Sequence, residues 1–357
     1  MPRSLTNLSS KSNLFNLLFI LFCINRNHYL LLTLETMYTA QDKNIAINVV
    51  AALKGHTGCI YALDRGLSGN TVFTGGSDLF IAQWNLETLQ AEKFATAFTA
   101  HLYTICHIHE KELLLAGTTD GSVHIIDVVK KKEIRILKHH QGPIFDIKYS
   151  LKTNCFYTVG GDGCLAVCSL DTLSLVKIKR LCLKKVRSID FNYYTSEMAI
   201  ALGTGDVLIY DLFSLQDKYQ LTSHRLSANS VRYSPDGKFL LTGGRDAYLN
   251  IWETGNYTQI KTTPAHNWAI YDIAYSPDAS LFATGSRDKT IKIWDAETFG
   301  FLKRISKEAF TGHSHSVNKL LWSPFNNYLI SVGDDKEVMI REINIDKNDA
   351  SSPLQEC

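Results

Sequence analysis

Residues 234–253 read SPDGKFLLTGGRDAYLNIWE, and residues 275–295 repeat the pattern as YSPDASLFATGSRDKTIKIWD. In each stretch a Ser-Pro-Asp turn leads into short runs of apolar and β-branched residues, which are typical of β-strands. A Gly-rich turn that carries an acidic residue separates the last two runs. The two Ser-Pro-Asp turns begin at Ser234 and Ser276, and a fixed period of this size indicates a repeat architecture.

The period runs through the chain in seven units. Each unit ends on a dipeptide that is usually bulky and then polar: Trp84-Asn85, Ile126-Asp127, Cys168-Ser169, Tyr210-Asp211, Trp252-Glu253, Trp294-Asp295 and Arg341-Glu342. The step between dipeptides is constant until the last, which is longer because of extra residues around Lys303 to Phe310. Each unit has room for about four strands, and no helical period stands out. The repeat predicts an all-β fold, a seven-bladed β-propeller of four-stranded antiparallel blades.

Two further markers recur. A histidine precedes the dipeptide at the same spacing in five units, at His56, His140, His224, His266 and His313; His101 is the shorter-spaced counterpart in the second unit, and Cys182 stands there in the fourth. An acid lies in each Gly-rich turn: Asp78, Asp120, Asp162, Asp206, Asp246, Asp288 and Asp335. Four residues before each acid lie Thr74, Ala116, Thr158, Leu202, Thr242, Thr284 and Ser331. Asp206 is two residues nearer to its dipeptide than the period requires, so we expect an irregular fourth turn.

These markers resemble the WD40-repeat family. Gly55-His56 and Gly312-His313 match its Gly-His pair, and Trp294-Asp295 is its Trp-Asp dipeptide. The resemblance covers about residues 45–345 and is specific for the fold, whereas propellers serve many unrelated functions. In this family the repeats are offset from the blades. The resemblance therefore implies that the strand-like segment at the start of the first unit closes the last blade beside Val338–Ile343 and hides its edge.

The marker residues resemble a catalytic triad, but we expect them to be structural. The set is complete in three units: His56, Thr74, Asp78 and Trp84; His224, Thr242, Asp246 and Trp252; His266, Thr284, Asp288 and Trp294. In the family the carboxylate, imidazole, hydroxyl and indole form a chain of hydrogen bonds, which satisfies buried polar groups. A set that recurs in three blades, without an oxyanion-hole motif, is architectural. Units two to four depart from it, as does unit seven at Arg341, and we expect blades two to four to depend more on apolar packing.

The resemblance also implies a partner-binding face, formed by the loops that lead into the innermost strands and by the acid-bearing turns. The residue five after each histidine, or its stand-in, points there: Tyr61, Cys106, Phe145, Arg187, Asn229, Tyr271 and Asn318. The turns add Arg245 and Arg287, with Asp334 of opposite charge, and Trp268 lies in one of the loops. Tyr, Trp and Arg dominate binding hot spots. We predict that partners bind Tyr61, Phe145, Arg187, Arg245, Trp268, Tyr271 and Arg287; the alternative is that these residues only line a wet channel.

The sequence thus favours a non-catalytic scaffold for protein–protein interactions, a monomeric propeller within a larger complex, without cofactor or metal. The alternative is a small-ligand site or an enzyme at the mouth of the central channel, which requires converging carboxylates or histidines. His107 and His109 lie near Glu110 and Glu112. With no third ligand evident, we interpret them as alternating residues at a solvated strand end rather than as a metal site.

Charge and cysteine content narrow the class further. The chain has 37 Lys and Arg against 35 Asp and Glu, and this near-neutral balance disfavours nucleic acid bound through phosphates. The basic runs Lys130–Lys132 and Lys177–Arg180, with Lys184, Lys185 and Arg187, could instead form one basic flank for an acidic partner or, as a weaker option, for nucleic acid. Eight cysteines without a CxxC pair favour free thiols in a reducing compartment, the cytoplasm.

The chain's ends are expected to lie outside the propeller. The apolar runs Leu14–Ile24 and Tyr29–Leu32 are too short to span a membrane, and no small-residue cleavage site follows the first. We interpret Met37 as the natural start and residues 1–36 as an upstream extension; the alternative is an uncleaved signal or anchor. Residues 346–357 are expected to form a flexible tail.

Overall fold

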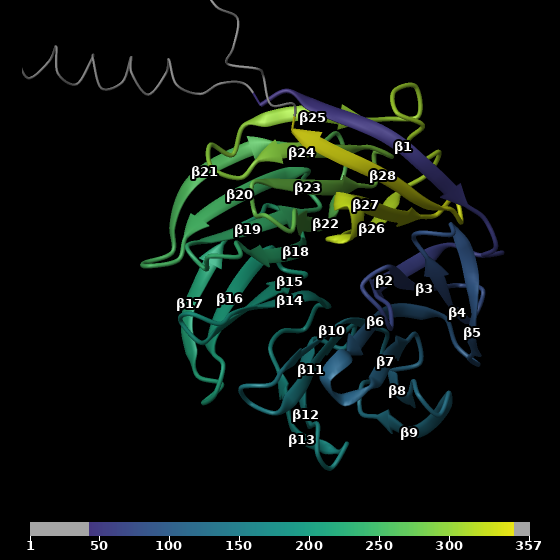
Figure 1. The fold of residues 1–357 in the computed structure, drawn as a ribbon. Helices are drawn as coiled ribbons and strands as arrows, with labels where there is room; N and C mark the ends of the chain where they lie inside the picture. The colour runs from purple at the N-terminus through teal and green to yellow at the C-terminus, as the bar shows by residue number, and fades with distance from the viewer. Residues whose placement is uncertain (1–42, 346–357) are drawn as a thin grey trace, which may run out of the picture. The chain divides into compact units, whose positions relative to one another are not determined.

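A computed structural model describes residues 43–345 of the protein; the predictions for residues 1–36 and 346–357 lie outside the described residues. The described chain forms seven four-stranded antiparallel sheets, arranged as blades around a common centre (Figure 1). The predicted seven-bladed propeller is confirmed. In the described part, no helix is long and apolar enough to cross a membrane.

The first four blades follow the chain in order from the innermost to the outermost strand. Blade 1 holds β2 (Ile60–Arg65), β3 (Thr71–Gly76), β4 (Phe80–Asn85) and β5 (Gln90–Ala97). Blade 2 holds β6 (Leu102–Ile108), the 3-10 turn η1 (His109–Lys111), β7 (Leu113–Thr118), β8 (Ser122–Asp127) and β9 (Lys132–Lys138). Blade 3 holds β10 (Ile144–Ser150), β11 (Cys155–Gly160), β12 (Cys164–Ser169) and β13 (Leu175–Arg180). Blade 4 holds β14 (Val186–Asn192), β15 (Glu197–Leu202), β16 (Asp206–Asp211) and β17 (Asp217–Thr222).

The remaining blades repeat this order, except that the last takes its outer strand from the other end of the propeller. Blade 5 holds β18 (Ala228–Tyr233), β19 (Phe239–Gly244), β20 (Tyr248–Glu253) and β21 (Thr258–Pro264). Blade 6 holds β22 (Ile270–Tyr275), β23 (Leu281–Ser286), β24 (Ile291–Asp295) and β25 (Phe301–Ile305). Blade 7 holds β26 (Val317–Trp322), the 3-10 turn η2 (Phe325–Asn327), β27 (Tyr328–Gly333), β28 (Val338–Ile345) and β1 (Ile45–Leu53).

Closure of the propeller depends on β1, which pairs antiparallel with β28 from Ile45 opposite Ile345 to Leu53 opposite Val338. The side chains of Ile45, Ile47 and Leu53 are buried. The pairing covers the edge of β28, which would otherwise expose unpaired backbone groups. The predicted closing strand is therefore confirmed.

Carboxylates on the innermost strands connect neighbouring blades. The side chain of Asp64 in blade 1 accepts from the backbone N–H of His107 in blade 2 at 2.8 Å, and Asp190 accepts from Tyr233 at 2.8 Å. Two further carboxylates, which lie nearer the start of their strands, also bond the next blade: Asp146 accepts from Ile189 N at 3.0 Å, and Asp272 accepts from Leu320 N at 3.0 Å. These bonds satisfy backbone groups that face a neighbouring sheet rather than a sheet partner.

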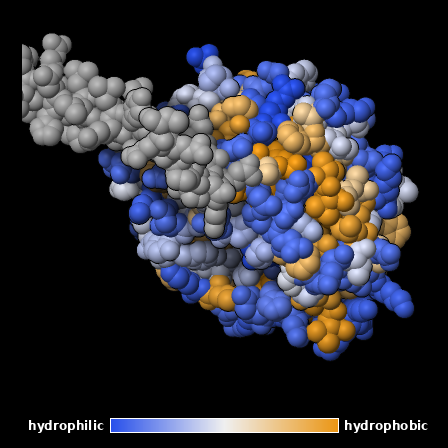
Figure 2. All heavy atoms as spheres, turned by 45° about the horizontal axis from the view of Figure 1, so that its top comes forward, coloured by the Kyte–Doolittle hydropathy of each residue, from blue (hydrophilic) through white to orange (hydrophobic). Residues whose placement is uncertain are grey.

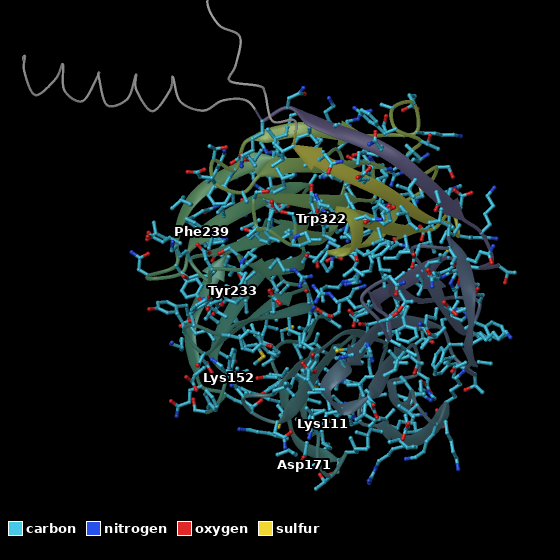
Figure 3. The ribbon with its side chains drawn as sticks, in the orientation of Figure 1. Lys111, Lys152, Asp171, Tyr233, Phe239 and Trp322 are labelled. Carbon is cyan, nitrogen blue, oxygen red and sulfur yellow. The ribbon has the colours of Figure 1, made fainter. Side chains whose placement is uncertain are left out.

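Side-chain contacts at the turns reinforce the order of the blades; Figure 3 labels some of their residues. Lys111 of blade 2 pairs with Asp171 of blade 3 at 3.5 Å. Lys152 of blade 3 donates to the carbonyl of Tyr193 in blade 4 at 2.6 Å. Between blades 5 and 6, the rings of Phe239 and Phe299 meet edge to face with centroids 5.0 Å apart, an arrangement that aromatic pairs prefer.

Candidate partner-binding face

A β-bulge recurs where each innermost strand begins, on the face where the chain enters these strands; we call this the mouth face. In blade 1 the pairing of β2 with β3 skips Tyr61, between Ile60 and Ala62. The same irregularity occurs in every other blade. The skipped residues form a set that we call the mouth ring: Tyr61, Tyr103, Phe145, Arg187, Asn229, Tyr271 and Asn318. A bulge leaves one residue outside the ladder and re-aims its side chain.

The second blade corrects one member of the predicted set. His101 is exposed, and Phe98 occupies the histidine position, because its backbone N–H bonds Leu79 O as His140 N bonds Gly121 O. Counting five residues from Phe98 gives Tyr103, whereas the predicted Cys106 is buried in the core. The spacing between histidine and dipeptide in the other units, counted back from Ile126, also leads to Phe98. The sequence period therefore contains the information needed to identify Phe98 and hence Tyr103.

The mouth ring contains a continuous row of aromatic and cationic side chains. The ring centroids of Tyr61 and Tyr103 lie 5.0 Å apart, and those of Tyr103 and Phe145 lie 5.4 Å apart. The guanidinium of Arg187 stacks against Phe145, 4.5 Å from its centroid. Such a contact orients the cation against the ring. Three predicted residues and the newly found Tyr103, each from a different blade, thus form one packed row.

Trp268 and Arg287 form a second pair on this face. Trp268 is 54% exposed, and the guanidinium of Arg287 lies 4.4 Å from its ring centroid. Arg245, in the β19–β20 turn, is also exposed, and Tyr271 in the mouth ring is half-buried. These are residue types that contribute most to interfaces, and the pair is accessible while its two side chains hold each other in place.

The two asparagines of the ring and Asp334 have structural contacts instead. Asn229 donates to Ile270 O at 3.1 Å, in the next blade. Asn318 donates to Ile60 O at 2.9 Å and to the carboxylate of Asp334 at 2.8 Å. Their amides therefore join blade 5 to blade 6 and blade 7 to blade 1.

The expected chain of hydrogen bonds is present in blades 1 and 6. His56 Nδ1 lies 2.7 Å from the Asp78 carboxylate and Nε2 lies 2.7 Å from Thr74 Oγ1, which accepts from Trp84 Nε1 at 2.7 Å. In blade 6, His266 lies 3.0 Å from Asp288 and 2.8 Å from Thr284, which accepts from Trp294 Nε1 at 3.0 Å. In blade 1 a Cβ at Gly55 would stand 3.0 Å from the Trp84 ring, which explains the glycine before the histidine.

Blade 5 departs from the predicted set at its indole. His224 bonds Asp246 and Thr242, each at 3.0 Å. The Thr242 hydroxyl, however, pairs with Ser223 at 2.7 Å, and the indole N–H of Trp252 has no partner among the described residues. The hydroxyl of Ser223 competes because it lies directly before the histidine, where blades 1 and 6 have Gly55 and Ala265.

Two other blades contain the network in forms that the sequence did not identify. In blade 3 His140 lies 3.0 Å from the Asp162 carboxylate and 2.9 Å from Thr158 Oγ1, so the expectation of mainly apolar packing is wrong there. In blade 7 His313 lies 2.8 Å from the Asp335 carboxylate and 2.8 Å from Ser331 Oγ. The fully buried Arg341 takes the place of the indole and donates to Ser331 Oγ at 3.1 Å.

Blades 2 and 4 lack the network. In blade 2 Ala116 occupies the position of the hydroxyl-bearing residue, and the carboxylate of Asp120 accepts from the Thr118 hydroxyl at 2.6 Å instead of bonding a histidine. In blade 3 the hydroxyl-bearing Thr158 lies opposite Ile147. The equivalent pair in blade 4 is Ile189 and Ile200, so Ile200 rather than Leu202 takes the position of the hydroxyl-bearing residue. In blade 3 the acid Asp162 follows His140 at a fixed spacing. The same spacing from Cys182 in blade 4 leads to Thr204 rather than Asp206, which explains the irregular fourth turn.

The network predicts different costs for two aspartate substitutions. Burial would raise the pKa of Asp246, but the hydrogen bond and charge of His224 hold it below the usual value. Asp246→Ala is expected to lower the free energy of unfolding by about 1–3 kcal/mol, because it leaves His224 Nδ1 and the N–H of Arg225 unpaired. Asp206→Ala is expected to cost under about 0.5 kcal/mol, since the Asp206 carboxylate accepts hydrogen bonds from the side chains of Thr204 and Gln220 at the surface. Urea unfolding measures both; equal losses would contradict the network.

A well-formed cavity lies at the other end of the channel and not at the mouth face. It has a volume of about 660 Å³ and reaches the loops after the innermost strands, with Tyr149, Tyr193 and Glu110 in its wall. Carboxylates do converge here, but Asp64, Asp146, Asp190 and Asp272 are engaged by backbone amides. Among the described residues no group of His, Cys, Asp and Glu is arranged to hold a metal ion.

The predicted single basic flank is divided between two places. Lys132 and Lys177–Arg180 lie on β9 and β13, the outermost strands of blades 2 and 3, where Lys179 pairs with Asp217 at 3.1 Å. Lys185 and Arg187 lie where the chain enters β14, at the mouth face. Figure 2 shows a surface on which hydrophobic groups are separated by hydrophilic residues.

Comparison with known proteins agrees with this architecture. The family model described as WD domain, G-beta repeat matches residues 47–85, 215–253, 257–295 and 304–341. Each match begins in or just before the outermost strand of one blade and ends in the third strand of the next, as the offset of repeats and blades requires. The protein is a repeat β-propeller. It belongs to the WD40-repeat family.

Curated relatives share this repeat at low identity. The chain is 26% identical over 189 residues to transcription factor unc-37 of Caenorhabditis elegans, which covers 52% of the chain and 30% of that protein. It is 26% identical over 215 residues to human echinoderm microtubule-associated protein-like 3, at 58% and 23% coverage. It is 24% identical over 249 residues to WD repeat-containing protein 1-B of Xenopus laevis, at 66% and 39% coverage. The aligned parts span less than half the length of these relatives.

Proposed function

We propose that this protein is a non-catalytic scaffold that binds other proteins through its mouth face, as a monomeric propeller within a larger complex. The packed row Tyr61–Tyr103–Phe145–Arg187 carries the proposal. Seven bulges place the mouth ring on rigid strands, and aromatic and arginine anchors on a rigid base are the usual origin of interface affinity. The His–Asp pairs form hydrogen-bond networks within the blades, and this structural use supports a function without catalysis.

The proposal predicts that partners depend on this face. In affinity purification followed by mass spectrometry, Tyr271→Ala/Arg287→Glu is expected to recover each specific partner in an amount at least about tenfold lower than the wild type does, as loss of a hot spot implies. The matched control is Tyr219→Ala/Arg135→Glu, which makes the same changes on the exposed outermost strands β17 and β9. Partners that survive the first variant unchanged, or that leave equally with both, would contradict binding at the mouth face.

We further propose that the protein is cytoplasmic. The six cysteines within residues 43–345 are all free, which supports a reducing compartment. Burial raises the pKa of Cys168 to about 12, so that thiol behaves as a packed apolar group. Cell fractionation with the endogenous protein tests this assignment.

A further inference from the structure

Three cations gather on one side of the mouth ring without carboxylate partners. Lys185 lies in the loop before β14, Arg187 at its start, and Arg245 in the β19–β20 turn. None of the ion pairs among residues 43–345 includes any of the three. Deeper in the channel the arrangement differs, since Arg232 lies 3.6 Å from Asp190 and 3.7 Å from Asp272. The cluster at the mouth is therefore an uncompensated positive site.

The three charges are close enough to act on one another. The charge of Arg187 lowers the pKa of Lys185, and burial and the charge of Arg245 lower it further. Burial lowers the pKa of Arg187, the nearby hydroxyl groups of Tyr271 and Tyr103 raise it, and the charge of Arg245 lowers it. Like charges held together destabilise the free protein, and a bound anion would remove this repulsion.

An aromatic ring holds two of the three cations in place. The ring of Phe145 has Arg187 at 4.5 Å and Lys185 Nζ at 5.9 Å from its centroid. Arg187 Nε is buried and has no hydrogen-bond partner among the described residues, so a donor of this site remains unused. Phe145 continues into Tyr103 and Tyr61, so an apolar surface adjoins the positive site directly.

We propose that Lys185, Arg187 and Arg245 bind the carboxylate of an Asp or Glu side chain in an acidic peptide segment, whose neighbouring apolar residue packs on Tyr103 and Phe145. This inference rests on the proposed function and specifies the partner's chemistry. The charge is complementary, and a stacked guanidinium is well suited to bind a carboxylate through two donors. Nucleic acid fits less well, because three cations at one point do not form the extended basic track that a phosphate backbone requires.

The test uses the full-length protein and three fluorescein-labelled probe peptides. They share the frame GSWXLXGS with X as Glu, Gln or phosphoserine, and fluorescence anisotropy measures their binding. We expect the Glu probe to bind at least about tenfold more tightly than the Gln probe at low salt, and this ratio to fall as salt screens the charges. Equal affinities for the Glu and Gln probes, or binding of the phosphoserine probe alone, would overturn the inference.

Two variants assign the effect to the cluster. Lys185→Gln/Arg245→Gln changes two exposed side chains, and we expect it to reduce the Glu-to-Gln ratio to near one without lowering the thermal midpoint. The control Lys132→Gln/Lys177→Gln removes two cations from the exposed outermost strands and is expected to leave the ratio unchanged. A ratio that both variants lower equally would overturn the site.

The same variant separates this inference from the proposed function. If cellular partners are lost from Tyr271→Ala/Arg287→Glu but stay bound to Lys185→Gln/Arg245→Gln at every salt concentration, the mouth face is the interface and the acidic-peptide site is wrong. If partners stay bound to both variants, the proposed function itself is wrong. If partners are lost from both variants and the Glu probe binds more tightly than the Gln probe, the proposed function and the acidic-peptide site are both supported.

Discussion

A chain that begins at Lys54, and so lacks β1, is expected to lose the closed propeller and to accumulate as aggregate. Burial of Ile45, Ile47 and Leu53 contributes about 1.5–3 kcal/mol each. Their combined loss, roughly 5–9 kcal/mol, is comparable to the whole stability of a typical domain. The truncation also exposes the edge of β28 from Val338 to Ile345, and such an edge pairs readily with other chains.

Light scattering after size-exclusion chromatography, together with thermal unfolding, checks this expectation. The matched control begins at Lys43 and keeps all of β1. A synthetic peptide of residues 43–54 added during refolding is expected to recover part of the monomer, because it can restore the missing strand. A monodisperse, cooperatively folded chain that begins at Lys54 would show that closure by β1 is dispensable.

The second large effect is expected at Arg341, the largest fully buried side chain. Its guanidinium donates to Phe310 O at 3.2 Å and to Thr311 O at 2.7 Å. Both residues have positive φ, 65° and 46°, so Arg341 holds the insertion that lengthens the last repeat. Burial lowers the pKa of Arg341 to about 10, against the opposing charge of Asp335. Arg341→Ala is expected to lower the free energy of unfolding by about 3–5 kcal/mol, through the cavity and the unpaired carbonyls.

Chemical denaturation measures the loss, and limited proteolysis follows the loop at residues 306–312. Arg341→Trp separates two contributions: an indole N–H can bond Ser331 as Trp84 bonds Thr74, but it cannot hold both loop carbonyls. We expect this variant to be more stable than Arg341→Ala while its loop is still cleaved faster. The exposed Arg304→Ala is the control, with a change within about 0.5 kcal/mol. A similar small loss for Arg341→Ala would show that the arginine does not stabilise blade 7.

Several contacts could not be predicted because their partners are far apart in the sequence. Asp64 bonds the amide of His107, in the next repeat, and no local pattern marks it as a bond between blades. Tyr103 was missed because the count began at His101, the visible histidine, although the period places Phe98 at that position. Arg341 was read as a departure from the pattern, whereas its long side chain reaches both the hydroxyl of Ser331 and the loop carbonyls.

The sequence alone determined the number of blades and the strands within them. The repeat is a local property: turns, alternating apolar runs and the His–Asp spacing all lie within one unit. Closure by the first strand followed from resemblance to a family with the same offset. The tertiary structure decided how the blades contact one another and which side chains meet at the mouth ring. Those contacts depend on how bulges and sheet packing bring separate repeats together, and residues from different units meet only when all seven sheets surround one axis.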